Sequence, residues 1–236
     1  MSGQPTIIVL GDPAALTRAV AERFEEVVRA AGHEPVSIAL SGGSTPKRLY
    51  ETLAASPFRE RIPWRRVEIF FGDERAVPPD HADSNWGMAK SALFDHVPAR
   101  AHRMAADTGD AEAYERLVRE RVRERQDGVP VLDLVLLGMG GDGHTASLFP
   151  GTEALKERAR LVMMNPVPKL DTRRMTFTYP LINAARRVWI VVSGADKRPV
   201  LSKCLRGEGD YPDLPILGVD PRGGELVWWL DEAAAP

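Results

Sequence analysis

The sequence predicts an α/β fold, with a Rossmann-like, mainly parallel sheet that carries helices on both faces, in a single domain. Three observations support this prediction. Short apolar runs rich in β-branched residues recur along the chain, most of them do not alternate with polar residues, and segments with helical spacing separate several of them. Such runs are typical of strands buried on both faces, and the alternation of strands with helices favours a parallel sheet.

Six strands and five helices are expected. The strands are 6–10, 36–40, 67–71, 132–137, 188–192 and 226–230, of which the first five should be buried on both faces. The first helix is indicated by Leu16, Val20, Phe24, Val27 and Ala31, with Gly32 at the place of a C-terminal cap. Further helices are expected at 46–55, 85–95, 110–126 and 197–205, and ordered loops at the proline-rich stretches 76–80 and 163–168.

Length and composition restrict the class of protein. A chain of 236 residues suits one α/β domain with additions, so we expect 1–236 to form a single domain. Charged residues make up 27% of the chain and the net charge is −2, which gives no overall field to attract nucleic acid or a membrane. The basic run 116–125 alternates with glutamates and indicates a solvated helix face. Neither nucleic acid nor a membrane is expected as a partner.

Cysteine usage and the apolar runs bear on the cellular compartment. Cys204 is the only cysteine, so an intramolecular disulfide and a cysteine-cluster metal site are excluded, and its helical surroundings favour a packed core thiol. The first residues lack the basic region and the apolar length of a signal peptide, and no run approaches the ~20 apolar residues that cross a bilayer. We therefore expect a cytoplasmic protein.

Unusual loops follow several of the expected strands, at the edge of a parallel sheet where ligands bind. In the first loop, Gly42 and Gly43 permit a tight turn and close approach of a ligand. Ser44 or Thr45 could cap the next helix, and Pro46 suits its first turn. Free N–H groups beside hydroxyls can hold a phosphate. An ordinary turn explains the motif alone nearly as well, because the lysine of a P-loop is missing.

The second loop begins with Asp73, Glu74 and Arg75, directly after the third expected strand. A surface turn with local ion pairs would explain an isolated triplet, but its place at a strand end favours function. Arg75 could offer a fork of donors to an anionic oxygen. The aspartates and histidine of 80–83 lack a recognised metal-ligand spacing, so a capped loop leading into a helix near Asn85 is expected there.

The third loop contains four glycines between 138 and 143 and then His144, the one histidine in such a loop. The imidazole's ordinary pKa of ~6.5 suits a general base at neutral pH. Asp142 could hold its tautomer or bind sugar hydroxyls, and both alternatives remain open. The other histidines, His33, His81, His96 and His102, are expected to be solvated. After the fifth strand, Lys197 begins a helix and could meet a phosphate, although a surface lysine is an equally good interpretation.

Taken together, the loops resemble those of the family of 6-phosphogluconolactonases and the related glucosamine-6-phosphate deaminases. The resemblance covers residues 7 to 229 and is carried by "LSGGSTP", "GDERAVPPDHADSN", "GMGGDGHTASLFPG", "RRMTFTYPLINAA" and "SGADKRPVL". It implies hydrolysis of 6-phospho-D-glucono-1,5-lactone to 6-phospho-D-gluconate, in the oxidative pentose phosphate pathway, with no metal and no cofactor. The expected partner is this phosphorylated sugar lactone, and the expected state is a monomer or weak homodimer.

The same resemblance assigns roles to residues of this chain. The expected catalytic residues are His144 as base, Asp142 and Arg75. The expected substrate contacts are Gly42, Gly43, Ser44, Thr45, Asp73, Gly140, Arg174 and Lys197, with Arg173 as an alternative to Arg174.

Three alternatives remain beside the lactonase. A deaminase-like isomerase is the nearest, but the resemblance implies tyrosine at Arg75 and glutamate at Phe149 for that branch. A non-catalytic sugar-phosphate sensor would keep the phosphate loop and would not need His144. A nucleotide-binding protein is disfavoured, because no acidic residue follows the glycine loop at the required distance.

Overall fold

The computed structural model describes residues 4–32 and 35–236. Within these ranges, seven strands form a central sheet in the order β1-β12-β11-β8-β2-β3-β5, and every neighbouring pair is parallel. Their bounds are β1 Thr6–Leu10, β2 Val36–Leu40, β3 Val67–Phe71, β5 Arg100–Ala101, β8 Leu134–Leu137, β11 Arg187–Val192 and β12 Glu225–Asp231. The predicted α/β fold with a mainly parallel sheet is confirmed.

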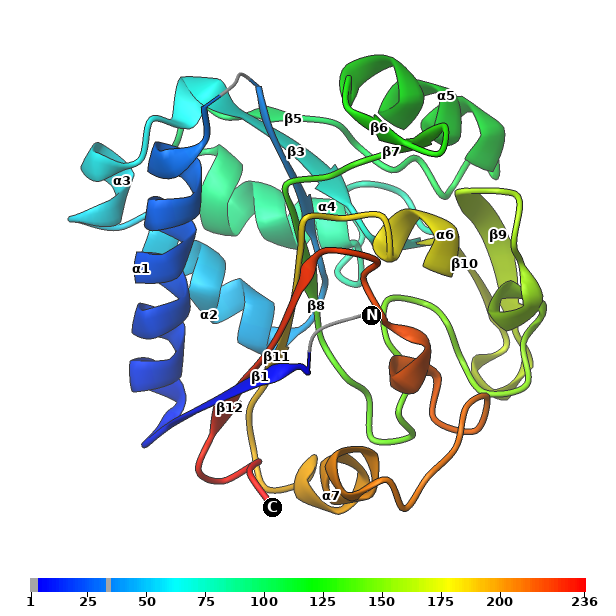
Figure 1. Cartoon of the computed structure of the whole chain (residues 1–236). Coiled ribbons are helices and arrows are strands. Elements are labelled where there is room, and N and C mark those ends of the chain that lie inside the picture. The colour runs from blue at the N-terminus through cyan, green and yellow to red at the C-terminus, as the bar shows by residue number, and fades with distance from the viewer. Residues whose placement is uncertain (1–3, 33–34) are drawn as a thin grey trace.

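Helices lie on both sides of this sheet, with α1 and α2 on one side and α5 and α6 on the other (Figure 1). The helices are α1 Pro13–Ala30, α2 Ser44–Leu53, α3 Phe58–Arg61, α4 Asn85–Ala89 continued by a π-helical turn Lys90–Phe94, α5 Ala111–Arg121, α6 Tyr179–Ile182 and α7 Arg198–Arg206. Short 3₁₀ turns span Trp64–Arg66, Glu153–Lys156, Pro168–Leu170 and Pro215–Gly218. The carboxylate of Asp12 accepts hydrogen bonds from the amides of Ala14 and Ala15 at the start of α1. The C-cap of this helix is Ala31, in extended conformation, and not Gly32 as predicted.

The order of the strands reverses between β2 and β8. From β2 the chain continues to β3 and β5 on one side, and from β8 it continues to β11 and β12 on the other. In open parallel sheets a crevice forms at such a point, outside the carboxyl ends of the two strands, and ligands bind there. The loops after β2 and β8 flank this point, and they are the two loops that carry the predicted phosphate turn and His144.

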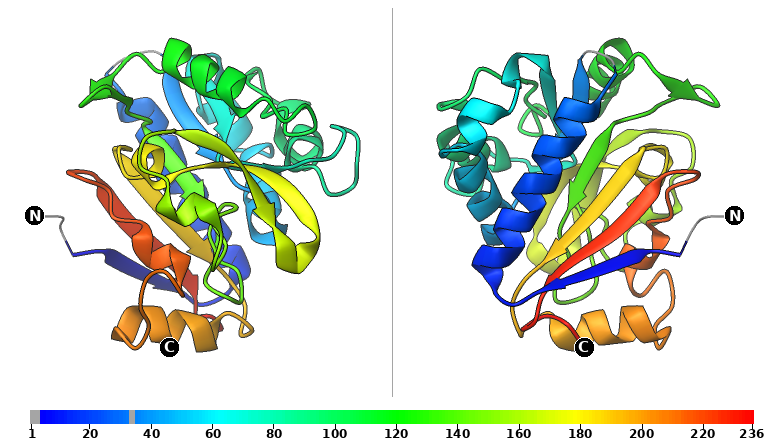
Figure 2. Two further views of the ribbon diagram at one scale, coloured as in Figure 1. Left: turned by 90° about the vertical axis from the view of Figure 1, so that its right-hand side faces the viewer. Right: turned by 60° about the vertical axis from the view of Figure 1, so that its left-hand side comes forward.

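A second sheet, antiparallel and of three strands, packs beside the first in the described part of the chain (Figure 2). It consists of β4 Asp73–Arg75, β10 Thr172–Phe177 and β9 Val162–Val167. The expectation of a loop at 163–168 is therefore wrong. Proline cannot donate to a sheet ladder, but Pro166 stands on an outer strand, where one edge needs no donors.

Strand β1 departs from its prediction. It was expected to be buried on both faces, but it is an edge strand that pairs with β12, and Ile7 and Val9 are 46% and 47% exposed. The last strand, β12, lies inside the sheet between β1 and β11, and it is buried from Val227 to Asp231. Sheet order depends on distant pairings, which the local apolar pattern does not contain.

Helix α5 is shorter than predicted, because it ends at Arg121 rather than at 126. A small hairpin follows, with β6 Arg125–Gln126 and β7 Val129–Pro130 joined by Asp127 and Gly128. Both turn residues have positive φ, 51° and 81°. Aspartate followed by glycine is a strong signal for this kind of two-residue turn, so the sequence contained the information that the helix does not continue.

Candidate active site

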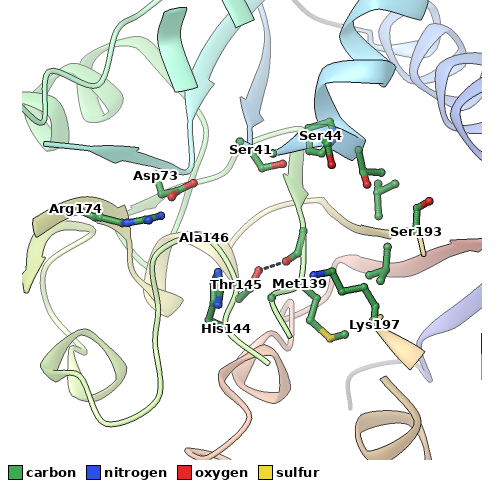
Figure 3. A pocket seen from close by; sticks show the side chains of 18 of the residues that line it. Ser41, Ser44, Asp73, Met139, His144, Thr145, Ala146, Arg174, Ser193 and Lys197 are labelled. Atoms are coloured by element: carbon green, nitrogen blue, oxygen red, sulfur yellow. Dashed lines mark hydrogen bonds between the residues drawn. The ribbon is translucent and has the colours of Figure 1, made fainter. Parts of the chain in front are cut away.

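The loops at the carboxyl ends of the strands surround a cavity of about 260 Å³. This volume lies below the ~300 Å³ at which pockets for drug-sized ligands begin, and it suits a small polar metabolite. Every residue predicted for the site except Asp142 lines this cavity. They are Gly42, Gly43, Ser44, Thr45, Asp73, Arg75, Gly140, His144, Arg174 and Lys197. Figure 3 shows that side chains from separate loops point into the same space.

The loop after β2 presents the start of α2 to the cavity. The Tyr50 hydroxyl donates to the carbonyl oxygen of Ser41 (2.7 Å) and accepts from its amide (3.0 Å), which fixes the end of the strand. Gly43, at a φ of 110°, is the residue that caps α2, so the prediction that Ser44 or Thr45 is the cap is wrong. As a glycine, it offers no side-chain cap to the first turn of this helix. Its first amides, beside two hydroxyls, are therefore available to an anion.

Glu74 holds the loop that leads into α4. Its carboxylate accepts from the amides of Asn85 and Trp86, both at 2.7 Å, and from the hydroxyl of Ser84 at 3.1 Å. Ser84 is also the N-cap of α4, so the predicted capped loop near Asn85 is confirmed. Burial raises the pKa of Glu74, and the hydrogen bonds from backbone amides lower it, so the two effects oppose each other. The buried carboxylate therefore fixes the loop that follows the triplet 73–75.

Asp73 forms part of the cavity wall. The residue is 5% exposed, and its Oδ2 accepts from the hydroxyl of Ser147 at 2.7 Å. Ser147 belongs to the loop after β8, so this bond joins the loop that carries Asp73 to the loop that carries His144. Sequence reasoning did not identify Ser147, because the contact joins residues 74 positions apart.

Two arginines reach the cavity from neighbouring strands. Arg75 in β4 and Arg174 in β10 are register partners, and Arg75 Nη1 donates to the carbonyl of Asp83 at 2.5 Å. Side chains alternate along a strand, so Arg173 points away from the face on which Arg174 lies, and Arg173 is exposed. Of the two alternatives, Arg174 lines the cavity and Arg173 does not.

The position of the His144 imidazole depends on its own loop. A Cβ atom at Gly140 would lie 2.1 Å from Cε1 and Nδ1 of the imidazole, so only glycine leaves room for the ring there. Nδ1 lies 2.5 Å from Oδ1 of Asp142, and Oδ2 of Asp142 pairs with Lys169. Because an ionised carboxylate can only accept, Nδ1 is the protonated nitrogen, and Nε2 keeps its lone pair.

Burial lowers the pKa of His144 to about 4. The negative charge of Asp73 opposes this shift, and the positive charges of Arg174, Lys197 and Arg75 reinforce it. The ring is therefore neutral at pH 7. Asp142 lies outside the cavity lining, which supports its role in orienting the imidazole over direct contact with sugar hydroxyls.

Lys197 lies immediately before α7, as predicted, and its side chain lines the cavity on the side opposite Arg174 (Figure 3). The loop before it is held by the buried carboxylate of Asp231, which accepts from the Ser193 hydroxyl at 2.5 Å and the Gly194 amide at 3.1 Å. Sequence reasoning missed Asp231 and Ser193, although Ser193 opens the same polar motif that contains Lys197.

The remaining histidines differ from one another. His81 and His96 are exposed, as expected, and His33 lies outside the described residues. His102 was expected to be solvated, but its ring stacks on Phe70 with 5.0 Å between the ring centroids, and only 11% of its side chain is exposed.

The described residues include no cluster of three or more histidine, cysteine or carboxylate side chains that could hold a metal. None of the helices in 4–32 and 35–236 is long and apolar enough to cross a membrane.

Proteins similar in sequence and structure identify the family of this chain. A family model described as glucosamine-6-phosphate isomerases/6-phosphogluconolactonase matches residues 11–228. A 6-phosphogluconolactonase from Nostoc sp. is 43% identical, over 97% of this chain and 96% of its own. A solved 6-phosphogluconolactonase from Trypanosoma cruzi superimposes with a TM-score of 0.86 at 34% identity, over 99% of this chain and 97% of the other. The chain therefore belongs to the glucosamine-6-phosphate isomerase/6-phosphogluconolactonase family.

Proposed function

We propose that this chain is a 6-phosphogluconolactonase, which hydrolyses 6-phospho-D-glucono-1,5-lactone to 6-phospho-D-gluconate in the oxidative pentose phosphate pathway. The observation that carries the proposal is the neutral imidazole of His144, bonded to Asp142 through Nδ1, on a cavity that also holds three cationic side chains. The relatives named 6-phosphogluconolactonase cover nearly the whole chain, which supports the same activity.

The phosphate of the substrate is assigned to one end of the cavity. The start of α2 offers amides and the hydroxyls of Ser44 and Thr45, and Lys197 offers an ammonium group. A dianion bound by a helix start and a lysine gains strong, charge-assisted hydrogen bonds. Binding at this remote end fixes the lactone ring and so positions its carbonyl carbon for attack.

The chemical step is assigned to His144. Nε2 takes a proton from a water molecule as the oxygen of that water forms a bond to C1 of the lactone. The bond between C1 and the ring oxygen then breaks, and the imidazolium returns the proton to that oxygen. Asp142 accepts a hydrogen bond from Nδ1–H throughout the reaction and does not take up the proton. This bond keeps the imidazole in the correct tautomer and stabilises the imidazolium.

Arg75 and Arg174 are assigned to the negative charge that develops on the carbonyl oxygen. They reach the cavity from paired strands and carry donors in a fixed planar arrangement. Loss of one such donor typically costs ~3 kcal/mol of transition-state stabilisation. Asp73, joined to Ser147, is proposed to contact hydroxyls of the sugar.

A deaminase-like activity is the second candidate on this scaffold. Ring opening and proton shuttling in a deaminase need an acid–base group where this chain has Phe149, which is 2% exposed and packs on the imidazole. A phenyl ring cannot transfer a proton, so the lactonase is favoured. A non-catalytic sensor is also less favoured, because phosphate binding alone needs no imidazole held by a carboxylate.

One assay separates these candidates. The purified chain is offered freshly made 6-phosphogluconolactone, and acid release is followed against a buffer blank, in parallel with ammonia release from glucosamine 6-phosphate. The lactonase assignment predicts acid release above the blank and no ammonia. Ammonia release would establish the deaminase, and binding without turnover would establish the sensor.

We further propose that the chain acts as one domain, in the cytoplasm, as a monomer or weak homodimer without a cofactor.

A further inference from the structure

The imidazole of His144 stacks on a buried aromatic ring. The centroid of Phe149 lies 4.0 Å from that of the imidazole, with an angle of 25° between the two planes. Phe149 follows in the same loop and is 2% exposed, whereas 27% of the His144 side chain remains accessible. The phenyl ring thus covers the imidazole on the protein side, and the accessible part of the imidazole is on the cavity.

Hydrogen bonding alone leaves the imidazole incompletely fixed. The bond from Nδ1 to Asp142 fixes which edge of the ring faces that carboxylate, but it permits the ring to tilt about the bond. The backbone of Gly140 lies close to the Cε1 and Nδ1 edge of the imidazole, but this contact at one edge does not set the tilt of the ring plane. The stacked phenyl ring restricts this tilt, because at 4.0 Å between the ring centroids a tilt of the imidazole would press its atoms into the face of Phe149.

The charges around the imidazole come from every element that packs against it. Asp142 lies on its own loop, Asp73 and Arg75 on β4, Arg174 on β10 and Lys197 before α7. Two cations also approach the phenyl ring itself, because Arg174 and Lys169 each lie 5.4 Å from its centroid. A ring face attracts cations, so Phe149 holds Arg174 near the imidazole without adding a group that could exchange protons.

We infer that Phe149 is a positioning residue for the hydrolysis, whose ring holds the imidazole of His144 in the plane from which Nε2 reaches the attacking water. This inference rests on the proposed function of His144 as the base. The ring has two separable effects. Its flat face sets the orientation of the imidazole, and its apolar bulk keeps water from the protein side of the imidazole.

Two substitutions separate these effects. Phe149→Leu keeps much of the apolar bulk and removes the flat face, and Phe149→Ala removes both. Phe24→Leu is the matched control, because Phe24 is a fully buried ring on α1 that packs on Trp64 and does not line the cavity. For each variant, kcat and KM are measured with 6-phosphogluconolactone, and the titration of the His144 imidazole is followed by NMR.

For Phe149→Leu, kcat should fall by about tenfold or more, while KM changes by less than about threefold, because a positioned base contributes only when its geometry is correct. In Phe149→Ala the midpoint of the His144 titration should also rise toward the ordinary value, because water reaches the ring. Phe24→Leu should change neither quantity. A kcat for Phe149→Leu equal to that of the native chain would overturn the inference. Equal losses of kcat and substrate binding would overturn it as well, since the ring would then only hold the cavity together.

The titration distinguishes a failure of this inference from a failure of the proposed function. If His144→Gln keeps full activity, His144 is not the base and the proposed function of this residue fails. The titration midpoint in Phe149→Ala reports the contact between the two rings whether or not the enzyme turns over. An unchanged midpoint in Phe149→Ala would refute the exclusion of water by the phenyl ring. A native kcat in Phe149→Leu, together with an inactive His144→Gln, would refute the positioning role of Phe149 and leave the proposed function of His144 intact.

Discussion

Arg75 in β4 and Arg174 in β10 are direct partners in an antiparallel ladder, and both line the same cavity. Like charges directly opposite each other destabilise a sheet. Burial lowers the pKa of Arg174, and the charge of Arg75 adds to this effect, while Asp73 opposes it. A negative charge bound between the two arginines would offset this repulsion, which supports their proposed contact with the oxyanion.

The first prediction concerns the two adjacent arginines of β10. Arg174→Ala should lower kcat/KM by about 10²-fold, because it removes a charged donor from the developing oxyanion, a change of ~3 kcal/mol. Arg173→Ala is the matched control, since Arg173 is exposed on the other face of the strand. Steady-state kinetics of both variants check this prediction. Equal kinetics for the two variants would mean that Arg174 does not contact the substrate.

The second prediction concerns the phosphate end of the cavity. Lys197→Ala should raise KM for the phosphorylated lactone by about tenfold, or ~1.4 kcal/mol, with little change in kcat, because the lysine binds ground state and transition state alike. Lys203 is exposed on α7, the helix that Lys197 precedes, and Lys203→Ala should leave KM unchanged. Loss of kcat at constant KM in Lys197→Ala would instead place this lysine in the chemical step.

The third prediction concerns the glycines beside the base. Gly140→Ala should lower kcat by about 10²-fold, because the new methyl group occupies the space of the imidazole and displaces it by the order of 1 Å. At Gly141 an added Cβ meets nothing within 4 Å, so Gly141→Ala should remain active. Kinetics and thermal unfolding of both variants test this. Full activity of Gly140→Ala would show that the position of the imidazole is not critical.

The fourth prediction is the pH dependence of the reaction. A base must be neutral to accept a proton, and burial lowers the pKa of His144 to about 4. Activity should therefore persist from neutral pH down to about 5 and be lost as the pH falls through about 4, rather than through the ordinary value of ~6.5. Initial rates between pH 3.5 and 7.5, corrected for the buffer blank at each pH, measure this limb. An acid limb centred near 6.5 would contradict the buried, neutral imidazole.

The sequence contained enough information for the main features of the fold and site. The apolar runs gave the central strands, and position at strand ends brought Asp73, His144 and Lys197 together as predicted, because parallel strands end at one edge of the sheet. The edge position of β1 could not be predicted, since it depends on pairing with β12, more than two hundred residues away. Strand β9 was hidden by Pro166, which the pattern alone assigns to a loop.

The finer features of the site depend on contacts between distant segments. The choice between Arg173 and Arg174 follows from the register of β10 against β4, which no local pattern contains. The contact of Asp142 with His144 and its absence from the cavity lining, which support the orienting role over contact with sugar hydroxyls, likewise depend on the folded loop. Lys169, which pairs with Asp142, gave no signal in the sequence, because it stands in an ordinary turn between β9 and β10.

The central claim is that His144 activates water, and its most direct test is the turnover of His144→Gln, a substitution close in size that keeps a hydrogen-bonding side chain. The kcat of this variant with 6-phosphogluconolactone should fall by about 10²- to 10⁴-fold, with the binding of 6-phosphogluconate retained. A kcat within a few-fold of the native value, measured on folded protein, would show that the water is activated by another group.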